Sequence, residues 1–142
     1  MKDYGYLSLL IRGDKINHEN ILNNTFMSPT SFSNKNDMLD EDKTDKIIDS
    51  IVYSIKFDNL NELENTSISF LDTLTKSKEF IWELSKEFHV EITYSIYTDF
   101  SSTGFIIPKD IINKIAEFHV GLYVSYFSFQ LNDDILTLLN QS

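Results

Sequence analysis

Near the N-terminus the chain reads Tyr4-Gly5-Tyr6-Leu7-Ser8-Leu9-Leu10-Ile11. Side chains in a β-strand point alternately to the two faces of a sheet. One face of this strand would therefore carry Tyr4, Tyr6, Ser8 and Leu10, and the other Gly5, Leu7, Leu9 and Ile11. Both faces are largely apolar, so the pattern predicts an interior strand of a sheet.

Four further segments have the character of strands. Residues 51–57 and 90–98 alternate between apolar and other side chains, and residues 122–129 are apolar and aromatic. Residues 30–33 follow Ser28-Pro29 and predict a brief edge strand. Polar turn segments separate these strands from the helices between them.

Three helices are expected. Asn17 is a good N-cap for a first helix over 18–26, and Pro108 is a favourable first-turn residue for a last helix that buries Ile111, Ile115 and Phe118. Between them, one long helix is predicted from an apolar stripe at helical spacing, with Thr66, Ser67 or Ser69 as its cap. The stripe comprises Phe70, Leu74, Ser77, Ile81, Leu84 and Phe88.

One short pattern occurs twice. Residues 87–92 and 117–122 both begin Glu-Phe-His-Val, and each lies where a helix gives way to a strand. In each copy the His, His89 or His119, is expected just past the helix, in the left-handed conformation that usually requires Gly. One helix–strand unit is therefore used twice.

This order of elements predicts one domain over 1–142 in the α+β class. We expect a two-layer sandwich with a ferredoxin-like βαββαβ core, extended by a C-terminal αβ unit, with a mostly antiparallel sheet. A doubly wound parallel sheet is the alternative, because three helices separate the four clear strands.

Composition excludes several functions. The 142 residues include no Cys, which removes thiolate catalysis, cysteine metal sites and disulfides. Twelve Lys and Arg stand against 22 Asp and Glu, a net charge of −10 that disfavours nucleic-acid binding. The N-terminus lacks the pattern of a secretion signal, and no apolar segment reaches the ~20 residues that a membrane helix needs. We therefore expect a cytoplasmic protein that does not bind membranes.

The acidic segment 34–50 is expected to form a loop. Its carboxylates could be solvated, could attract a basic partner, or could bind calcium. The spacing argues against calcium, because Asp45 stands where a calcium loop that starts at Asp40 needs Gly. No metal or other cofactor is expected.

His89 and His119 are the strongest candidates for chemistry. If the two repeated junctions lead into neighbouring strands, these side chains could meet beside Glu87, Glu91 and Glu117 in an acid–base or metal cluster. A favourable contact with a helix C-terminus explains each His without any reaction. No nucleophile elbow or phosphate-binding Gly loop is present, so an enzyme is the less favoured interpretation and no catalytic residue is assigned.

Aromatic side chains crowd the last two predicted strands: Tyr94, Tyr97, Tyr123, Tyr126, Phe127 and Phe129. They could form core, a protein interface, or a small-molecule pocket. If all helices cover one side of the sheet, an aromatic surface is left on the other.

A family resemblance rests on three groups of residues. They are Thr93 to Asp99, then Gly104-Phe105 with Ile107-Pro108, then Ile112, Ile115-Ala116 and Phe118. With Tyr6 to Ile11, Gly13-Asp14 and Pro29-Thr30, this pattern resembles the bacterial family called domain of unknown function 4279. The resemblance implies a small α+β sandwich and no established activity. Some members look like accessory genes of the immunity type.

We therefore expect a protein-binding module, most concretely an immunity-type inhibitor that neutralises a basic toxin domain. Complementary charge would speed the capture of such a partner. The expected contact residues are Asp37, Asp40, Glu41, Asp42, Asp45, Tyr97, Asp99, Tyr123 and Tyr126. A small-molecule binder or enzyme using His89 or His119 is the alternative, and self-association through the aromatic strands into a homodimer is a third possibility.

Overall fold

A computed structural model describes residues 3–25, 29–33, 49–99 and 104–128. It contains five strands, four α-helices and one short 3-10 helix. In chain order they are β1 (Asp3–Gly13), α1 (His18–Asn24), β2 (Ser31–Ser33), β3 (Asp49–Phe57), η2 (Leu60–Glu62), α2 (Leu63–Thr75), α3 (Lys78–Ser85), β4 (His89–Thr98), α4 (Lys109–Ala116) and β5 (Gly121–Ser128).

The five strands form one sheet in the order β2-β3-β1-β4-β5. Within the group β2-β3-β1-β4, every neighbouring pair of strands is antiparallel, and their order is that of a ferredoxin-like core. β5 lies beside β4 and runs parallel to it, because α4 carries the chain back across the sheet. The predicted extended α+β fold is confirmed, and the alternative of a doubly wound parallel sheet is wrong.

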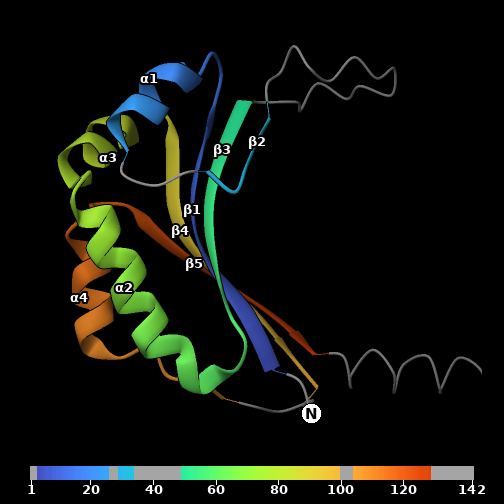
Figure 1. Cartoon of the computed structure of the whole chain (residues 1–142). Coiled ribbons are helices and arrows are strands. Elements are labelled where there is room, and N and C mark those ends of the chain that lie inside the picture. Colours follow the sequence, from blue (N-terminus) through green and yellow to red (C-terminus); the bar gives the residue numbers. More distant parts are fainter. Residues whose placement is uncertain (1–2, 26–28, 34–48, 100–103, 129–142) are drawn as a thin grey trace, which may run out of the picture.

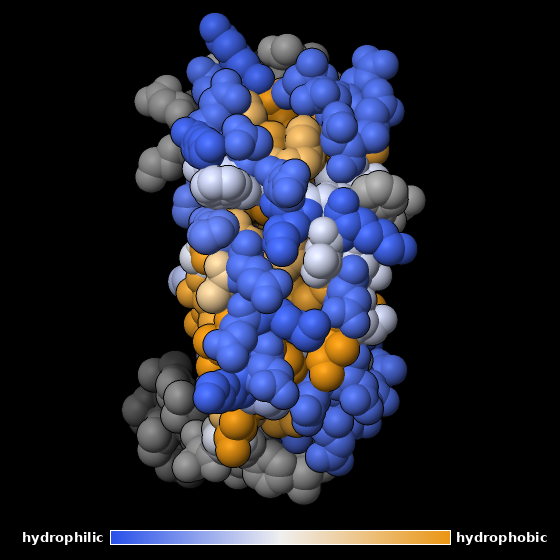
Figure 2. Space-filling view, turned by 90° about the vertical axis from the view of Figure 1, so that its left-hand side faces the viewer, coloured by the Kyte–Doolittle hydropathy of each residue, from blue (hydrophilic) through white to orange (hydrophobic). Residues whose placement is uncertain are grey.

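All four α-helices lie on one face of the sheet (Figure 1). Figure 2 shows this helical side, where polar side chains cover most of the surface and apolar ones lie between them. The core lies between the helices and the sheet. Its largest fully buried side chains are Tyr53, Tyr94, Phe57, Phe70, Phe118, Leu7, Leu9, Ile11, Ile21, Ile51, Leu71 and Leu74.

β1 is the interior strand that its sequence predicts, since β3 and β4 pair with its two sides. Its Leu7, Leu9 and Ile11 are fully buried beneath the helices. Tyr4, Tyr6, Ser8 and Leu10 alternate with them and are only half-buried on the other face. That second face, which no described helix covers, is called the open face below.

The first helix ends earlier than predicted. Asn17 caps it as expected, with its Oδ1 accepting a hydrogen bond from the Asn20 backbone N–H at 3.0 Å. The helix stops at Asn24, and Thr25 is extended. The Thr25 hydroxyl hydrogen-bonds to the Tyr53 hydroxyl at 2.8 Å, which attaches this end of the helix to β3.

The predicted long helix is two helices. α2 begins at Leu63, before the predicted caps, and a break at Lys76-Ser77 separates it from α3. The hydroxyls of Thr73 and Thr75 donate to the carbonyls of Ser69 and Leu71, a type of bond that bends helices. The apolar stripe continues across the break, because Leu74, Ser77 and Ile81 are all buried.

The acidic segment is shorter than predicted at its C-terminal end. Asp49 and Ser50 belong to β3. The Asp49 carboxylate is buried and accepts a hydrogen bond from the Ile16 backbone N–H at 3.1 Å, so it has a structural role. Asp37, Asp40, Glu41, Asp42 and Asp45 lie outside the described residues.

The repeated junctions do lead into neighbouring strands. β4 pairs with β5 from Glu91 with Gly121 through Thr98 with Ser128, a constant offset equal to that of the sequence repeat. His119 has the predicted left-handed backbone, with φ of 56°. The same prediction is wrong for His89, which is the first residue of β4 and does not have a positive φ.

Candidate functional site

The open face carries a row of stacked aromatic rings. Tyr4 stacks on Tyr97 with ring centroids 4.9 Å apart, and Tyr97 stacks on Phe127 at the same spacing. Lys56 lies over the Tyr4 ring at 5.2 Å, in a cation–π contact. We call these four side chains, one each from β3, β1, β4 and β5, the aromatic ladder.

The ladder follows from strand register. Tyr4 is paired with Tyr97, and Tyr97 with Phe127. Neighbouring strands lie about 4.8 Å apart, so rings in register stack at that spacing. Tyr6 packs edge-on against both Tyr4 and Tyr97, which widens the aromatic area.

Away from the ladder the open face is more polar, although Leu10 and Val52 also lie on it. Small hydroxyl side chains occupy its middle, where Ser8 and Ser54 share a hydrogen bond of 2.7 Å. At the end farthest from the ladder, Arg12 is paired with His89. His89 Nε2 lies 2.8 Å from Glu91 Oε2. The aromatic end of this face therefore differs chemically from the opposite end.

Carboxylates flank the aromatic end. Asp3 begins β1, Asp58 follows β3, and Asp99 follows β4, which brings all three to one end of the sheet. Asp3 accepts a hydrogen bond from the Thr98 hydroxyl, and Asp58 lies 3.5 Å from Lys56. We call Asp3, Asp58 and Asp99 the acidic rim.

The structure brings some of the predicted contact residues together. Tyr97 belongs to the ladder, Asp99 lies in the rim, and Tyr123 projects from β5 on the open face with 55% of its surface exposed. Tyr126 points to the opposite face, where it stacks on Phe105 with centroids 6.4 Å apart. The acidic segment joins the sheet at Ser33 and Asp49, at the end away from Tyr97.

The sequence analysis did not single out five residues in and around the ladder, namely Tyr4, Tyr6, Lys56, Asp3 and Asp58. Tyr4 and Tyr6 share one face of a period-two strand, which is a usable signal. Their stacking with Tyr97 depended on which strands were neighbours, and only tertiary structure supplied that. Trp82 lies off the centre of its apolar stripe, and its 42% exposure agrees with that position.

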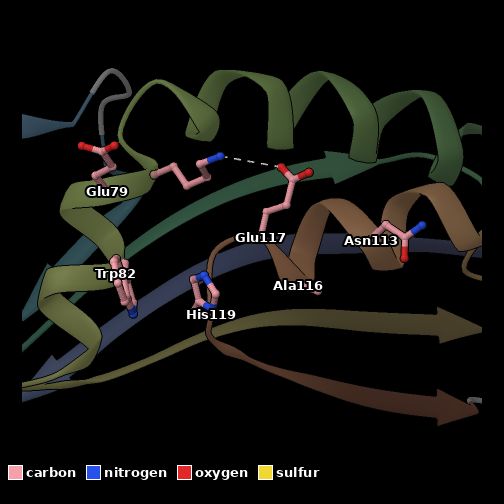
Figure 3. Close-up of a pocket in the computed structure, with 7 residues that line it drawn as sticks. Glu79, Trp82, Asn113, Ala116, Glu117 and His119 are labelled. Atoms are coloured by element: carbon pink, nitrogen blue, oxygen red, sulfur yellow. Dashed lines mark ion pairs between the residues drawn. The ribbon is translucent and has the colours of Figure 1, made fainter.

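A second candidate site is a groove between α3 and α4, with a volume of about 570 Å³ (Figure 3). Trp82 of α3 and His119, which follows α4, face each other across it with ring centroids 5.1 Å apart. Lys78 and Glu117 form an ion pair of 3.9 Å at its rim. Glu79, Asn113 and Ala116 complete the lining.

His89 and His119 do not share a site. The His89 imidazole contacts Glu91 on the open face, whereas the His119 ring contacts Trp82 in the helical layer. Among the residues that the structure describes, no three His, Asp or Glu side chains are close enough together to hold a metal ion. Any chemistry of His119 would involve Glu117 and Trp82 rather than His89.

Two tyrosines are buried inside the sandwich. Burial raises the pKa of Tyr94, and its hydrogen bond with Ser67, 2.6 Å long, partly offsets that rise. Burial likewise raises the pKa of Tyr53, against the smaller effect of its bond with Thr25. Both hydroxyls therefore stay protonated near neutral pH and serve as structural hydrogen-bonding groups.

None of the described helices has the length and apolar character needed to cross a membrane. The molecule is an α+β sandwich whose sheet is covered by helices on one face and carries stacked aromatic rings on the other. The chain belongs to the family described as "Domain of unknown function (DUF4279)", whose model matches residues 3–128. Comparisons with curated proteins and with solved structures gave no match.

Proposed function

We propose that this protein is a protein-binding module that holds its partner on the open face. The observation that carries the proposal is the stack of Tyr4, Tyr97 and Phe127 on a sheet face that no described helix covers. Phe127 is 47% exposed, and the neighbouring Tyr123 is more exposed still. Tyr and Phe are enriched in protein interfaces, where they contribute a large apolar area at low entropic cost.

The partner that fits best is a basic protein. Asp3, Asp58 and Asp99 flank the ladder, and the whole chain carries a net charge of −10. Interfaces often combine an apolar centre with a charged rim, and charge complementarity speeds association. An immunity-type inhibitor that neutralises a basic toxin domain in the cytoplasm is the specific form of this proposal.

Co-expression tests the proposal. The chain would be tagged, expressed with the product of its adjacent gene, and purified, and co-eluting protein would be identified by mass spectrometry. A basic protein that co-elutes in stoichiometric amount and inhibits growth when expressed alone would support the hypothesis that the chain is an inhibitor. Elution of the chain alone argues against it.

Variants then locate the contact surface. Tyr97→Ala with Phe127→Ala removes two ladder rings and should reduce co-purification at least tenfold, since truncating a central aromatic costs more than about 1.4 kcal/mol at a hot spot. Glu64→Lys is the matched control, because Glu64 is exposed on α2 in the helical layer. If both variants retained the partner equally well, the open face would not be the surface that binds it.

The groove beside Trp82 supports a second candidate function, the binding of a small molecule. Its volume and its combination of one indole, one imidazole and two carboxylates suit a ligand with an aromatic ring or a positive charge. Trp82 is the only Trp in the chain, so its fluorescence reports on the groove. A ligand that raises the melting temperature should quench Trp82, and His119→Asn should weaken both effects.

A further inference from the structure

The two edges of the sheet differ in how they are protected. Natural edge strands avoid unwanted pairing through short length, charged side chains, Pro or bulges. β2, at one edge, is only three residues long. β5, at the other, has eight residues, Gly-Leu-Tyr-Val-Ser-Tyr-Phe-Ser, with neither a charged residue nor Pro. Among the described residues, β5 pairs with β4 alone.

β5 also presents apolar side chains on both faces. Tyr123 and Phe127 are exposed on the open face. Leu122 and Val124 are exposed on the helical face. An occupant that sits on one face of the sheet would cover only half of these side chains. A strand added at the edge contacts both sets, and it also pairs with the strand backbone.

The absence of charged residues in β5 indicates which kind of strand could pair with it. A basic partner is drawn to carboxylates, and β5 has none. A neutral edge instead complements another neutral, aromatic strand, and β5 itself has that composition. Two copies can pair antiparallel about a two-fold axis at Ser125, which sets Tyr123 opposite Phe127 of the second copy and Val124 opposite Tyr126 of the second copy.

We propose that β5 is a self-association edge through which two copies form one continuous sheet. In this register Tyr123 of the second copy would stack beside Phe127 and extend the aromatic ladder across the interface. A shift of two residues would set Phe127 opposite Gly121 or Ser125 and lose that contact. The proposal does not rest on the proposed function, because it needs no other partner.

Mass measurement tests for the dimer. Sedimentation equilibrium of the purified chain over a wide concentration range should give twice the mass of 16.5 kDa at the high end. Tyr123→Lys should give a monomer, because it buries an unpaired charge in the interface. The substitution lowers the net negative charge, so added repulsion between copies cannot explain dissociation. Ile106→Lys, at a position 83% exposed outside β5, makes the same charge change and should leave the dimer intact.

Cross-linking tests the register. The chain has no Cys, so Ser125→Cys introduces a single thiol. At the two-fold axis the two copies of this residue would lie about 4.5–5.5 Å apart between Cα atoms, within disulfide range. Mild oxidation should therefore give a covalent dimer. Ser95→Cys is the control, since Ser95 pairs with Ser125 one strand further in and its two copies would lie roughly 14 Å apart.

The expected result is a dimer that Tyr123→Lys dissociates and that Ser125→Cys traps faster than Ser95→Cys. The proposal is overturned by a wild-type chain that stays monomeric at every concentration, or by a dimer that Tyr123→Lys leaves intact. Equal cross-linking of the two Cys variants also overturns it. If circular dichroism shows that Tyr123→Lys does not fold, the two Cys variants alone test the proposed dimer. Ser→Cys is a small change that should leave the fold intact.

Discussion

His119 combines a left-handed backbone with a ring contact. Its φ is 56°, and its imidazole lies against Trp82. A left-handed conformation costs a residue with a Cβ roughly 1–2 kcal/mol, least for residues such as His that tolerate it, and most for β-branched residues. The sequence pattern therefore predicted this backbone correctly at His119, and Trp82 supplies a contact that holds it.

Replacing His119 by Gly and by Val tests the stability cost of the left-handed backbone alone, since both substitutions remove the imidazole. We expect His119→Val to be less stable than His119→Gly by about 1–2 kcal/mol, measured by urea unfolding. His89 is the matched control because it begins a strand. There the order should reverse, with Val more stable than Gly. If the Gly and Val variants had the same order of stability at both positions, the left-handed backbone assigned to His119 would be contradicted.

The buried hydroxyls of Ser67 and Tyr94 satisfy each other. Tyr94→Phe would leave the Ser67 hydroxyl buried without its partner, which costs about 1–3 kcal/mol of unfolding free energy. Adding Ser67→Ala should recover much of that loss, because no polar group is then left unpaired. Tyr123→Phe on the exposed edge is the control and should change stability little. A double variant no more stable than Tyr94→Phe would argue that the loss comes from packing.

The same tyrosines predict a dependence on alkaline pH. Burial raises the pKa of Tyr53 and Tyr94 above the ordinary value of 10.0, so the folded state holds these protons more tightly than the unfolded state. Their contribution to stability is fully present below pH 10 and is lost as pH rises through the folded pKa values. Urea unfolding at several pH values should show this fall, and Tyr94→Phe should make it shallower.

At the scale of elements, close approach of the strands depends on Gly5. A Cβ built at this position would lie 2.6 Å from the Ser95 carbonyl oxygen of β4 and would also overlap the Phe57 ring of β3. The central strand can therefore sit between β3 and β4 only because Gly5 has no side chain. Its role is steric, since its φ is not positive.

Gly5→Ala should destabilise the fold by about 1–3 kcal/mol, because the sheet must separate or Phe57 must move. Gly121→Ala is the control, since a Cβ there meets no atom within 4 Å. We expect the control to change stability by less than about 0.5 kcal/mol. Thermal unfolding followed by circular dichroism measures both variants. Equal effects would show that loss of backbone freedom, rather than contact with Phe57 and Ser95, dominates.

At the scale of the whole molecule, the proposed function and the proposed dimer rest on how charge and apolar surface are distributed. Helices cover one face of the sheet, the ladder occupies the other, and the edge at β5 is neutral. The open face would serve a protein partner and the β5 edge a second copy. A dimer would place two ladders in one sheet, so that one assembly could hold two partners.

The net charge of −10 predicts salt-sensitive capture of a basic partner. Raising ionic strength from about 10 to 150 mM shortens the screening length from roughly 30 to 8 Å, so the association rate constant should fall by tenfold or more. Stopped-flow mixing measures this rate. The double variant Asp58→Lys with Asp99→Lys reverses two charges beside the ladder, whereas Glu64→Lys reverses one charge in the helical layer. For each charge reversed, the double variant should slow association more. A rate that does not respond to salt would exclude steering by charge.

Much of the fold could be predicted from the sequence, because local patterns report local structure. Strand alternation located β1, β3 and β4, and the spacing of Ile111, Ile115 and Phe118 located α4. Helix boundaries were less accurate. Thr73 and Thr75 weaken the helix through side-chain hydrogen bonds to backbone carbonyls, which the spacing of apolar residues does not reveal.

The candidate site was harder to predict. Tyr97, Asp99 and Tyr123 were recognised individually, but Tyr126 proved to face the other way and Tyr4 was not included. A period-two pattern says which residues share a face of one strand, and it does not say which strands are neighbours. The acidic segment was grouped with the aromatic residues, whereas its two attachment points lie at the other end of the sheet.

By itself, the sequence determined the class of fold, the interior position of β1 and the left-handed residue at His119. These follow from interactions between residues close in the chain. Tertiary structure alone decided that Tyr4, Tyr97 and Phe127 stack, that His89 and His119 lie apart, and that β5 is an edge strand among the described residues. Those facts depend on strand order and on which face the helices cover, and both are set by burial of the whole core at once.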